Sequence, residues 1–155
     1  MKYLLLLRGV NVGGQRKVVM KELKSDLENL SYEEVLTYIN SGNVIFVTSK
    51  EKTQVREELM IYFEKNYNFE VKFVLLNKEE YLTDLEELPD WWQQPIARRD
   101  GLFWICEDAT SMIEKIKTYP VTSEKVYFGQ QAIYWGKKDE VEFLKTAYHR
   151  LLILM

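Results

Sequence analysis

The order of strand-like and helix-like segments in the first half of the chain constrains its fold more than any other feature of the sequence. Short apolar or β-branched runs predict strands at residues 3–7, 35–39, 44–47 and 69–76. Between them, apolar residues recur with the 3.6-residue period of amphipathic helices: Met20, Leu23, Leu27 and Leu30, and later Val55, Leu59, Tyr62 and Phe63. The resulting order, β-α-β-β-α-β, is that of the ferredoxin-like plait, an antiparallel sheet with helices on one face.

The same order begins again in the second half of the chain. Strands are predicted at residues 102–106, 125–128 and 132–135, and helices at 109–118 and from 140 to about 152. We therefore expect an α+β protein of two ferredoxin-like modules, residues 1–76 and 101–155. A helical linker that contains Trp91 and Trp92 joins them at residues 77–100. The second module lacks the last strand of the plait.

The missing strand has a physical consequence, because it would lie beside the first strand of its sheet. Without it, residues 102–106 keep unpaired backbone groups at an open edge. Either the chain is shortened at its C-terminus, or another chain supplies the pairing. One candidate function is therefore that of a structural or protein-interaction module that forms a homodimer through this edge.

Charge is unevenly distributed along the chain. The net charge of −3 and the isoelectric point of about 5.4 argue against a surface built throughout for nucleic acid. Residues 1–20, however, contain no acidic residue and have a charge of +4, from Lys2, Arg8, Arg16 and Lys17. A local anion-binding site is thus compatible with the net negative charge of the whole chain.

The cellular compartment is indicated by the cysteine content and by the N-terminus. The single Cys106 excludes an internal disulfide and suits a reducing compartment. The apolar run that ends before Arg8 is too short for a signal peptide, and no segment is long enough to span a membrane. We expect a cytoplasmic protein with no membrane partner.

A glycine-rich loop, RGVNVGGQRK at residues 8–17, follows the first strand. Successive glycines let backbone N–H groups converge on an anion, and a following helix adds partial positive charge. The glycine spacing is that of a Walker loop, but Gln15 and Arg16 stand where its lysine and hydroxyl residue would be. The alternative is structural: the glycines only adopt positive φ angles and Asn11 caps a turn.

A second polar segment surrounds the turn between the strands at 35–39 and 44–47. Together the two segments supply the residues expected to bind a ligand: Arg8, Asn11, Gly13, Gly14, Arg16, Lys17, Tyr38, Ser41 and Asn43. Ser41-Gly42-Asn43 is also ordinary turn chemistry. The sequence leaves open whether the two segments share one site.

The two segments also carry a family resemblance. LLRGVNVGG at residues 6–14 and TYINSGNV at residues 37–44 resemble the motifs of the family called domain of unknown function 1697. The resemblance implies two linked plait modules in a bacterial cytosolic protein without an established activity. Members of that family usually continue into a strand with an Arg-Asn pair followed by Thr, whereas this sequence ends in LLILM at residues 151–155.

A further alternative is nucleic-acid binding by the second module. Strand alternation would place one aromatic of each pair, Phe103-Trp104 and Tyr134-Trp135, on the helix-free face of its sheet, where bases could stack. This function is not favoured, because such rings more often pack against protein. We likewise expect Trp91 and Trp92 to form an aromatic plug between the modules.

Catalysis has little support in the sequence. His149 is the only histidine and has no nucleophile or acid at a recognisable spacing, and Cys106 lies in a predicted strand. We predict no catalytic residue, no metal site and no cofactor. An enzyme stays an alternative if the full-length chain brings the Arg-Asn strand of the family to the first loop. The favoured function is therefore noncatalytic binding of a phosphate-bearing small molecule at residues 8–17.

Overall fold

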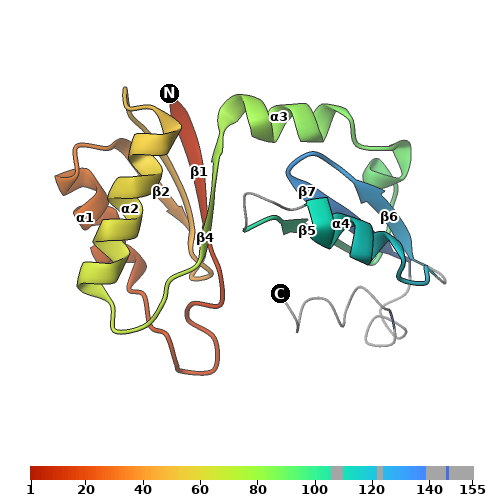
Figure 1. Cartoon of the computed structure of the whole chain (residues 1–155), viewed down its shortest axis with the longest axis horizontal. Helices are drawn as coiled ribbons and strands as arrows, with labels where there is room; N and C mark the ends of the chain where they lie inside the picture. The colour runs from red at the N-terminus through yellow and green to blue at the C-terminus, as the bar shows by residue number, and fades with distance from the viewer. Residues whose placement is uncertain (106–109, 122–123, 139–145, 147–155) are drawn as a thin grey trace. The chain divides into compact units, whose positions relative to one another are not determined.

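The structure is a computed structural model that describes residues 1–105, 110–121, 124–138 and 146. The chain divides into two compact units, Met1–Tyr81 and Leu82–Met155. Each unit has its own antiparallel sheet and its own helices (Figure 1). Each also has its own hydrophobic cluster. The protein is therefore of the α+β class.

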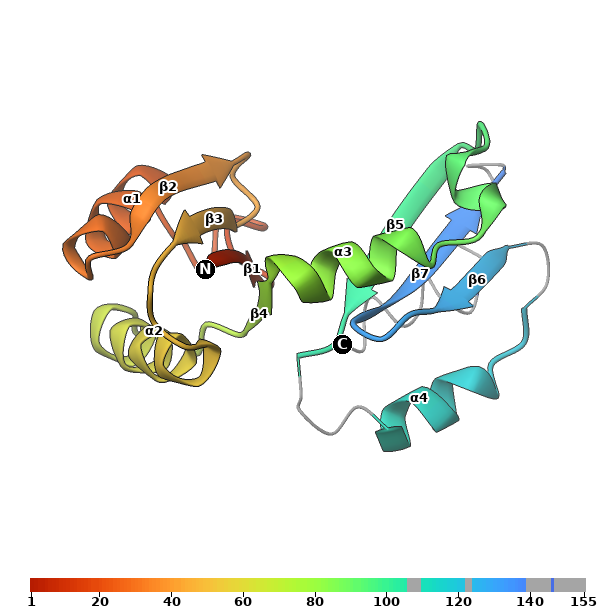
Figure 2. The same cartoon turned by 90° about the horizontal axis from the view of Figure 1, so that it is seen from above.

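The first unit contains four strands and two complete helices, and a third helix begins in it and ends in the second unit. The strands are β1 (Lys2–Leu7), β2 (Glu33–Tyr38), β3 (Asn43–Val47) and β4 (Phe73–Asn77), and the helices are α1 (Met20–Asn29) and α2 (Lys52–Asn66). All neighbouring strands are antiparallel, in the order β2-β3-β1-β4. Both helices lie on the same side of this sheet (Figure 2).

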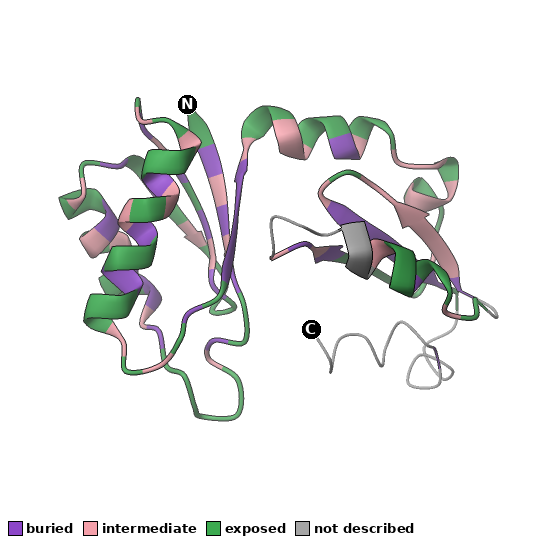
Figure 3. Ribbon diagram, viewed as in Figure 1, coloured by how far each residue is buried: buried purple, intermediate pink, exposed green. Residues whose placement is uncertain are grey.

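The core of the first unit lies between the sheet and the two helices. Along β1, Tyr3, Leu5 and Leu7 are buried, whereas the residues between them are half-buried (Figure 3). The two helical stripes predicted from the sequence meet this face, and all their members except the half-buried Leu30 are buried. The spacing of apolar residues was thus sufficient to identify what these two helices contribute to the core.

Local interactions explain where two of the helices begin and end. After α1, the N–H of Tyr32 donates to the carbonyl of Leu27, and that of Ser31 donates to Glu28, which is the Schellman pattern with Ser31 at φ +65°. The helix α3 (Lys78–Glu86) follows β4 directly. Asn77 and Glu80 form a reciprocal capping box there, with hydrogen bonds of 2.8 and 2.9 Å.

The second unit has a three-stranded sheet in the order β5-β7-β6, all antiparallel. Its elements are the 3-10 helix η1 (Asp90–Gln93), β5 (Arg98–Phe103), α4 (Thr110–Lys117), β6 (Lys125–Phe128) and β7 (Ala132–Lys137). The hydrophobic cluster consists of Leu102, Trp104, Ile116, Ile133 and Trp135. Among the described residues, β5 pairs on one side only, with β7.

The central strand β7 is buried along its whole length, and α3 contributes to this burial. The carboxylate of Asp84 is fully buried and accepts hydrogen bonds from the N–H groups of Gln130 and Gln131 and from the hydroxyl of Tyr134, at 2.7 to 3.0 Å. A Cβ on Gly129 would lie 2.6 Å from this carboxylate, so the turn between β6 and β7 requires glycine. Asp84 thus joins α3 to the hairpin of its own unit.

Several strand predictions were wrong at their ends. β5 occupies Arg98–Phe103 rather than residues 102–106, because its polar first half still pairs with β7. β4 begins at Phe73 rather than at residue 69, and β2 ends at Tyr38 because Ile39 has a φ of +48°. Cys106 and His149 lie outside the described residues, as does the predicted helix at residues 140–152 with the exception of Thr146.

Candidate functional site

The glycine-rich segment forms an exposed hairpin at the end of β1. Hydrogen bonding between β1 and the β4 side of the sheet continues one residue beyond the strand ends Leu7 and Phe73. The N–H of Arg8 donates to the carbonyl of Lys72 at 2.8 Å. The chain then folds back, and Asn11 N–H donates to the carbonyl of Arg16 at 3.1 Å. At the tip, Gly13 and Gly14 have φ angles of +63° and +75°, and Gln15 N–H donates to Val12. Positive φ at both central residues is the requirement of a type I′ turn.

The side chain of Asn11 joins this hairpin to the second polar segment. Its Nδ2 donates to the carbonyls of Val18 and Asn40, and its Oδ1 accepts from the N–H of Val18, each at 2.8 Å. Asn11 itself has a φ of +58°, which asparagine tolerates better than most residues. The two segments that the sequence left unconnected therefore meet through one amide.

A backbone contact reinforces this junction. The N–H of Leu7 donates to the carbonyl of Gly42 at 2.9 Å. A Cβ on Gly42 would lie 2.6 Å from the Cβ of Leu7 and 2.9 Å from Val10, so only glycine allows this approach. Next to it, Asn43 Nδ2 donates to the hydroxyl of Ser41 at 2.8 Å, on the exposed side. We call the residues 8–17 and 38–43 the paired loops.

The charged side chains of the paired loops are all positive. Arg8, Arg16 and Lys17 are exposed, and none of them forms an ion pair with a described acidic residue. The guanidinium of Arg16 lies above the backbone of Gly9, 3.8 Å from where a Cβ would be. By contrast, Lys50 and Lys52 in the same unit form ion pairs with Glu58 and Glu80, with distances from Nζ to the carboxylate oxygen of 2.8 and 2.6 Å.

Unusual backbone conformations are concentrated in the paired loops. Nine described residues have positive φ angles, and seven of them lie here: Gly9, Asn11, Gly13, Gly14, Arg16, Ile39 and Gly42. For the β-branched Ile39 this conformation is a true outlier. Strained residues persist where the surrounding structure holds them, and they are found most often at functional sites.

The expected ligand-binding residues therefore fall into three groups. Asn11, Gly13 and Gly14 shape the loops, which is also the structural role considered from the sequence. Arg8, Arg16 and Lys17 provide unpaired charge, and the side chains of Tyr38, Ser41 and Asn43 belong to the second loop. Sequence reasoning missed the carbonyl of Asn40 as the partner of Asn11, and no local signal could have identified it.

The prediction that aromatic rings of the second unit form an exposed face is wrong for Trp104, Tyr134 and Trp135, whereas Phe103 is half-buried. Tyr134 and Trp135 are 2% and 1% exposed, and Trp104 belongs to the hydrophobic cluster. Tyr134 is covered by the ring of Trp92, whose centroid lies 5.3 Å away, while Trp91 would touch a Cβ on Gly136. Both faces of β7 are therefore occupied, and its rings have no surface on which bases could stack.

Two other features bear on function. In the part of the chain that the structure describes, no helix is long and apolar enough to cross a membrane. The same residues include no group of three or more histidine, cysteine or acidic side chains that could hold a metal ion.

Comparisons with known proteins place this fold among uncharacterised proteins. The sequence model described as protein of unknown function (DUF1697) matches residues 1–134. The chain is similar to a solved structure, the conserved bacterial protein SP0830 from Streptococcus pneumoniae, with 42% sequence identity and a TM-score of 0.92. The similarity covers 99% of this chain and 86% of that chain. No curated protein matches the sequence.

Proposed function

The chain belongs to the DUF1697 family of proteins of unknown function, and on that premise we propose that its first unit binds a phosphate-bearing ligand at the paired loops, without catalysis. One observation carries the proposal: Arg8, Arg16 and Lys17 are exposed on a braced hairpin with no acidic partner among the described residues.

The type of charge favours phosphate over a carboxylate. Two guanidinium groups offer planar pairs of donors that match phosphate oxygens, and a lysine adds a third cation. A di- or triphosphate has enough oxygens to engage all three cations, whereas a single carboxylate does not. The exposed hydroxyl of Ser41 and amide of Asn43 add neutral donors nearby.

The rigidity of the paired loops also supports binding. The three hydrogen bonds of Asn11 and the contact of Leu7 with Gly42 order the backbone before any ligand arrives. A loop that is already ordered loses less conformational entropy on binding, so more of the electrostatic attraction contributes to affinity.

Isothermal titration of the whole chain with inorganic pyrophosphate tests this proposal. We expect Arg16→Glu to weaken binding by at least about tenfold, because it removes a charge-assisted hydrogen bond and adds a repelling carboxylate. Binding should also weaken with rising salt.

Lys65→Glu is the matched control, since Lys65 is an exposed cation of α2 outside the paired loops and the change in net charge is the same. It should reduce the affinity far less than Arg16→Glu. Equal affinity of the two variants, or no binding of pyrophosphate by the wild type, would contradict the proposal.

The arrangement of strands and helices also bears on the fold of the first unit. We infer that the first unit is a ferredoxin-like plait, which is supported by the order β2-β3-β1-β4 and by the helices on one side of the sheet.

Pairing of two copies of the chain through the edge strand β5 stays a prediction. The charged residues Arg98, Arg99 and Asp100 on that strand weigh against it, because charges at a sheet edge discourage pairing.

A further inference from the structure

We infer that the phosphate-bearing ligand is a nucleoside di- or triphosphate whose base stacks on Tyr38. This inference rests on the proposed function and adds to it the chemical class of the ligand. It comes from the position of one exposed ring relative to Arg8, the first cation of the paired loops.

Tyr38 is the only exposed aromatic side chain among the described residues, with 70% of its surface accessible. Other rings of the first unit pack in its core, for example Tyr3 and Tyr32 on either side of Phe46. A tyrosine left uncovered at the end of a strand lacks the burial that stabilises the core rings of this unit. Its ring is therefore available to a ligand.

Strand register places Tyr38 and Arg8 on the same face of the sheet. Tyr38 pairs with Asn43, and Asn43 pairs with Leu6, so these residues form one row across three strands. Leu7 points into the core, so Arg8, two residues after Leu6, follows Leu6 on the helix-free face. Standard strand spacings then put about 12 Å between the Cα atoms of Tyr38 and Arg8.

The surface between the ring and Arg8 includes polar side chains beside the half-buried Leu6. Asn43 lies directly between Tyr38 and Leu6 in the row, and its amide is bonded to the exposed hydroxyl of Ser41. Both side chains retain hydrogen-bonding capacity that suits a sugar or the edge of a base. An acyl chain crossing the same surface would leave these groups without partners, which costs free energy.

The surroundings of Tyr38 extend the stacking surface. Leu36, Ile39 and Ile45 are 60%, 61% and 38% exposed, and Leu36 pairs with Ile45 in the next row of the same face. A ring flanked by aliphatic side chains gives a flat apolar platform for one base. The single aromatic ring argues for a mononucleotide rather than for a nucleic-acid strand, which requires several stacking positions.

The test compares ADP with inorganic pyrophosphate by isothermal titration of the whole chain. We expect Tyr38→Ala to weaken ADP binding by about 5- to 100-fold, the loss measured for one stacked base. Pyrophosphate has no base, so its affinity should be unchanged. Tyr38→Phe keeps the ring and should retain most of the ADP affinity.

Ile61→Ala is the matched control, because Ile61 is a similarly exposed apolar residue on α2. It should leave both affinities unchanged. If the wild type binds pyrophosphate and Tyr38→Ala leaves ADP affinity unchanged, the nucleotide inference is wrong and the phosphate site stands. If neither compound binds, both proposals are wrong.

Discussion

Gly42 and Gly13 show that two glycines with positive φ can be required for different reasons. Both lie in the paired loops, with φ angles of +84° and +63°. A Cβ on Gly42 would overlap Leu7 and Val10, whereas one on Gly13 would meet nothing within 4 Å. Glycine at position 42 is therefore required both by the close contacts and by the positive φ angle, whereas glycine at position 13 is required by the φ angle alone.

Alanine substitution separates these two effects. Gly13→Ala should lower the free energy of unfolding by about 1–2 kcal/mol, the cost of a left-handed residue with a side chain. Gly42→Ala should add about 1–3 kcal/mol of overpacking to that cost. Urea unfolding followed by far-ultraviolet circular dichroism would measure both. An equal loss in the two variants would show that the approach of Leu7 to Gly42 is not as close as described.

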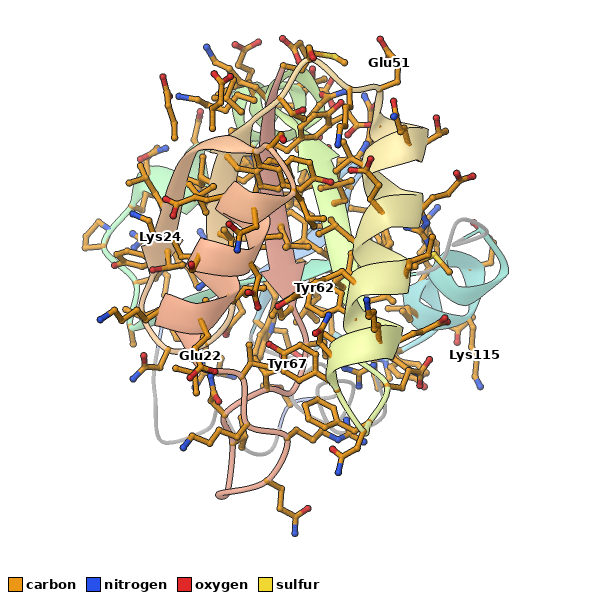
Figure 4. The ribbon with its side chains drawn as sticks, turned by 90° about the vertical axis from the view of Figure 1, so that its left-hand side faces the viewer. Glu22, Lys24, Glu51, Tyr62, Tyr67 and Lys115 are labelled. Carbon is orange, nitrogen blue, oxygen red and sulfur yellow. The ribbon has the colours of Figure 1, made fainter. Side chains whose placement is uncertain are left out.

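The helices of the first unit are linked by a partly buried polar contact. The hydroxyl of Tyr62 on α2 donates to Asp26 on α1 at 2.6 Å, and Tyr67 follows at the end of α2 (Figure 4). Burial, and then the hydrogen bond to Asp26, raise the pKa of Tyr62 far above its ordinary value of 10.0. On the other side of the core, burial and a hydrogen bond to Glu58 likewise raise the pKa of Tyr32.

A raised tyrosine pKa makes stability depend on alkaline pH. The unfolded chain loses the phenolic proton near pH 10, whereas the folded chain keeps it. The contribution of Tyr62 is therefore fully present below that pH and is lost progressively above it. Tyr62→Phe should lower the free energy of unfolding by about 1–2 kcal/mol at neutral pH. The substitution should also make the decline of the free energy of unfolding above pH 10 shallower than in the wild type.

Urea unfolding at a series of pH values measures this difference. Tyr38→Phe is the matched control, because it makes the same chemical change at an exposed residue and should leave the pH dependence unaltered. A decline of equal steepness in wild type and Tyr62→Phe would exclude the Tyr62–Asp26 contact as its source.

At the scale of the whole molecule, the two units have separate hydrophobic clusters and different aromatic contents. All four tryptophans, Trp91, Trp92, Trp104 and Trp135, belong to the second unit. Tryptophan fluorescence therefore reports the unfolding of the second unit, while circular dichroism reports both. Since each cluster consists of residues of one unit, we expect two separable transitions.

Asp84→Asn tests this expectation. The amide cannot accept all three hydrogen bonds that the buried carboxylate accepts, so the second unit should lose about 2–4 kcal/mol of stability. The fluorescence transition should move to lower urea, whereas Gly42→Ala should move only the dichroism of the first unit. Asp90→Asn, at an exposed carboxylate of the same unit, is the control. Parallel shifts of both signals in both variants would show that the chain unfolds as one cooperative structure.

The sequence by itself determined the helices of the first unit, their buried stripes and the order of strands and helices along the chain, because hydrophobic periodicity is a local property. It also contained the family motifs and the positive charge of residues 1–20. The polar first half of β5 escaped this reasoning, since a strand paired on one side needs no apolar pattern.

Only the tertiary structure decided which distant groups meet. Asn11 reaches the carbonyl of Asn40 across 29 residues, and Asp84 reaches the turn before β7 across about 46. Packing also buried Tyr134 and Trp135 and left Tyr38 exposed, although all three are aromatic residues in predicted strands. Periodicity indicates that a side chain leaves the backbone on a given face, but the elements that pack against that face determine whether it forms core or remains accessible to a ligand.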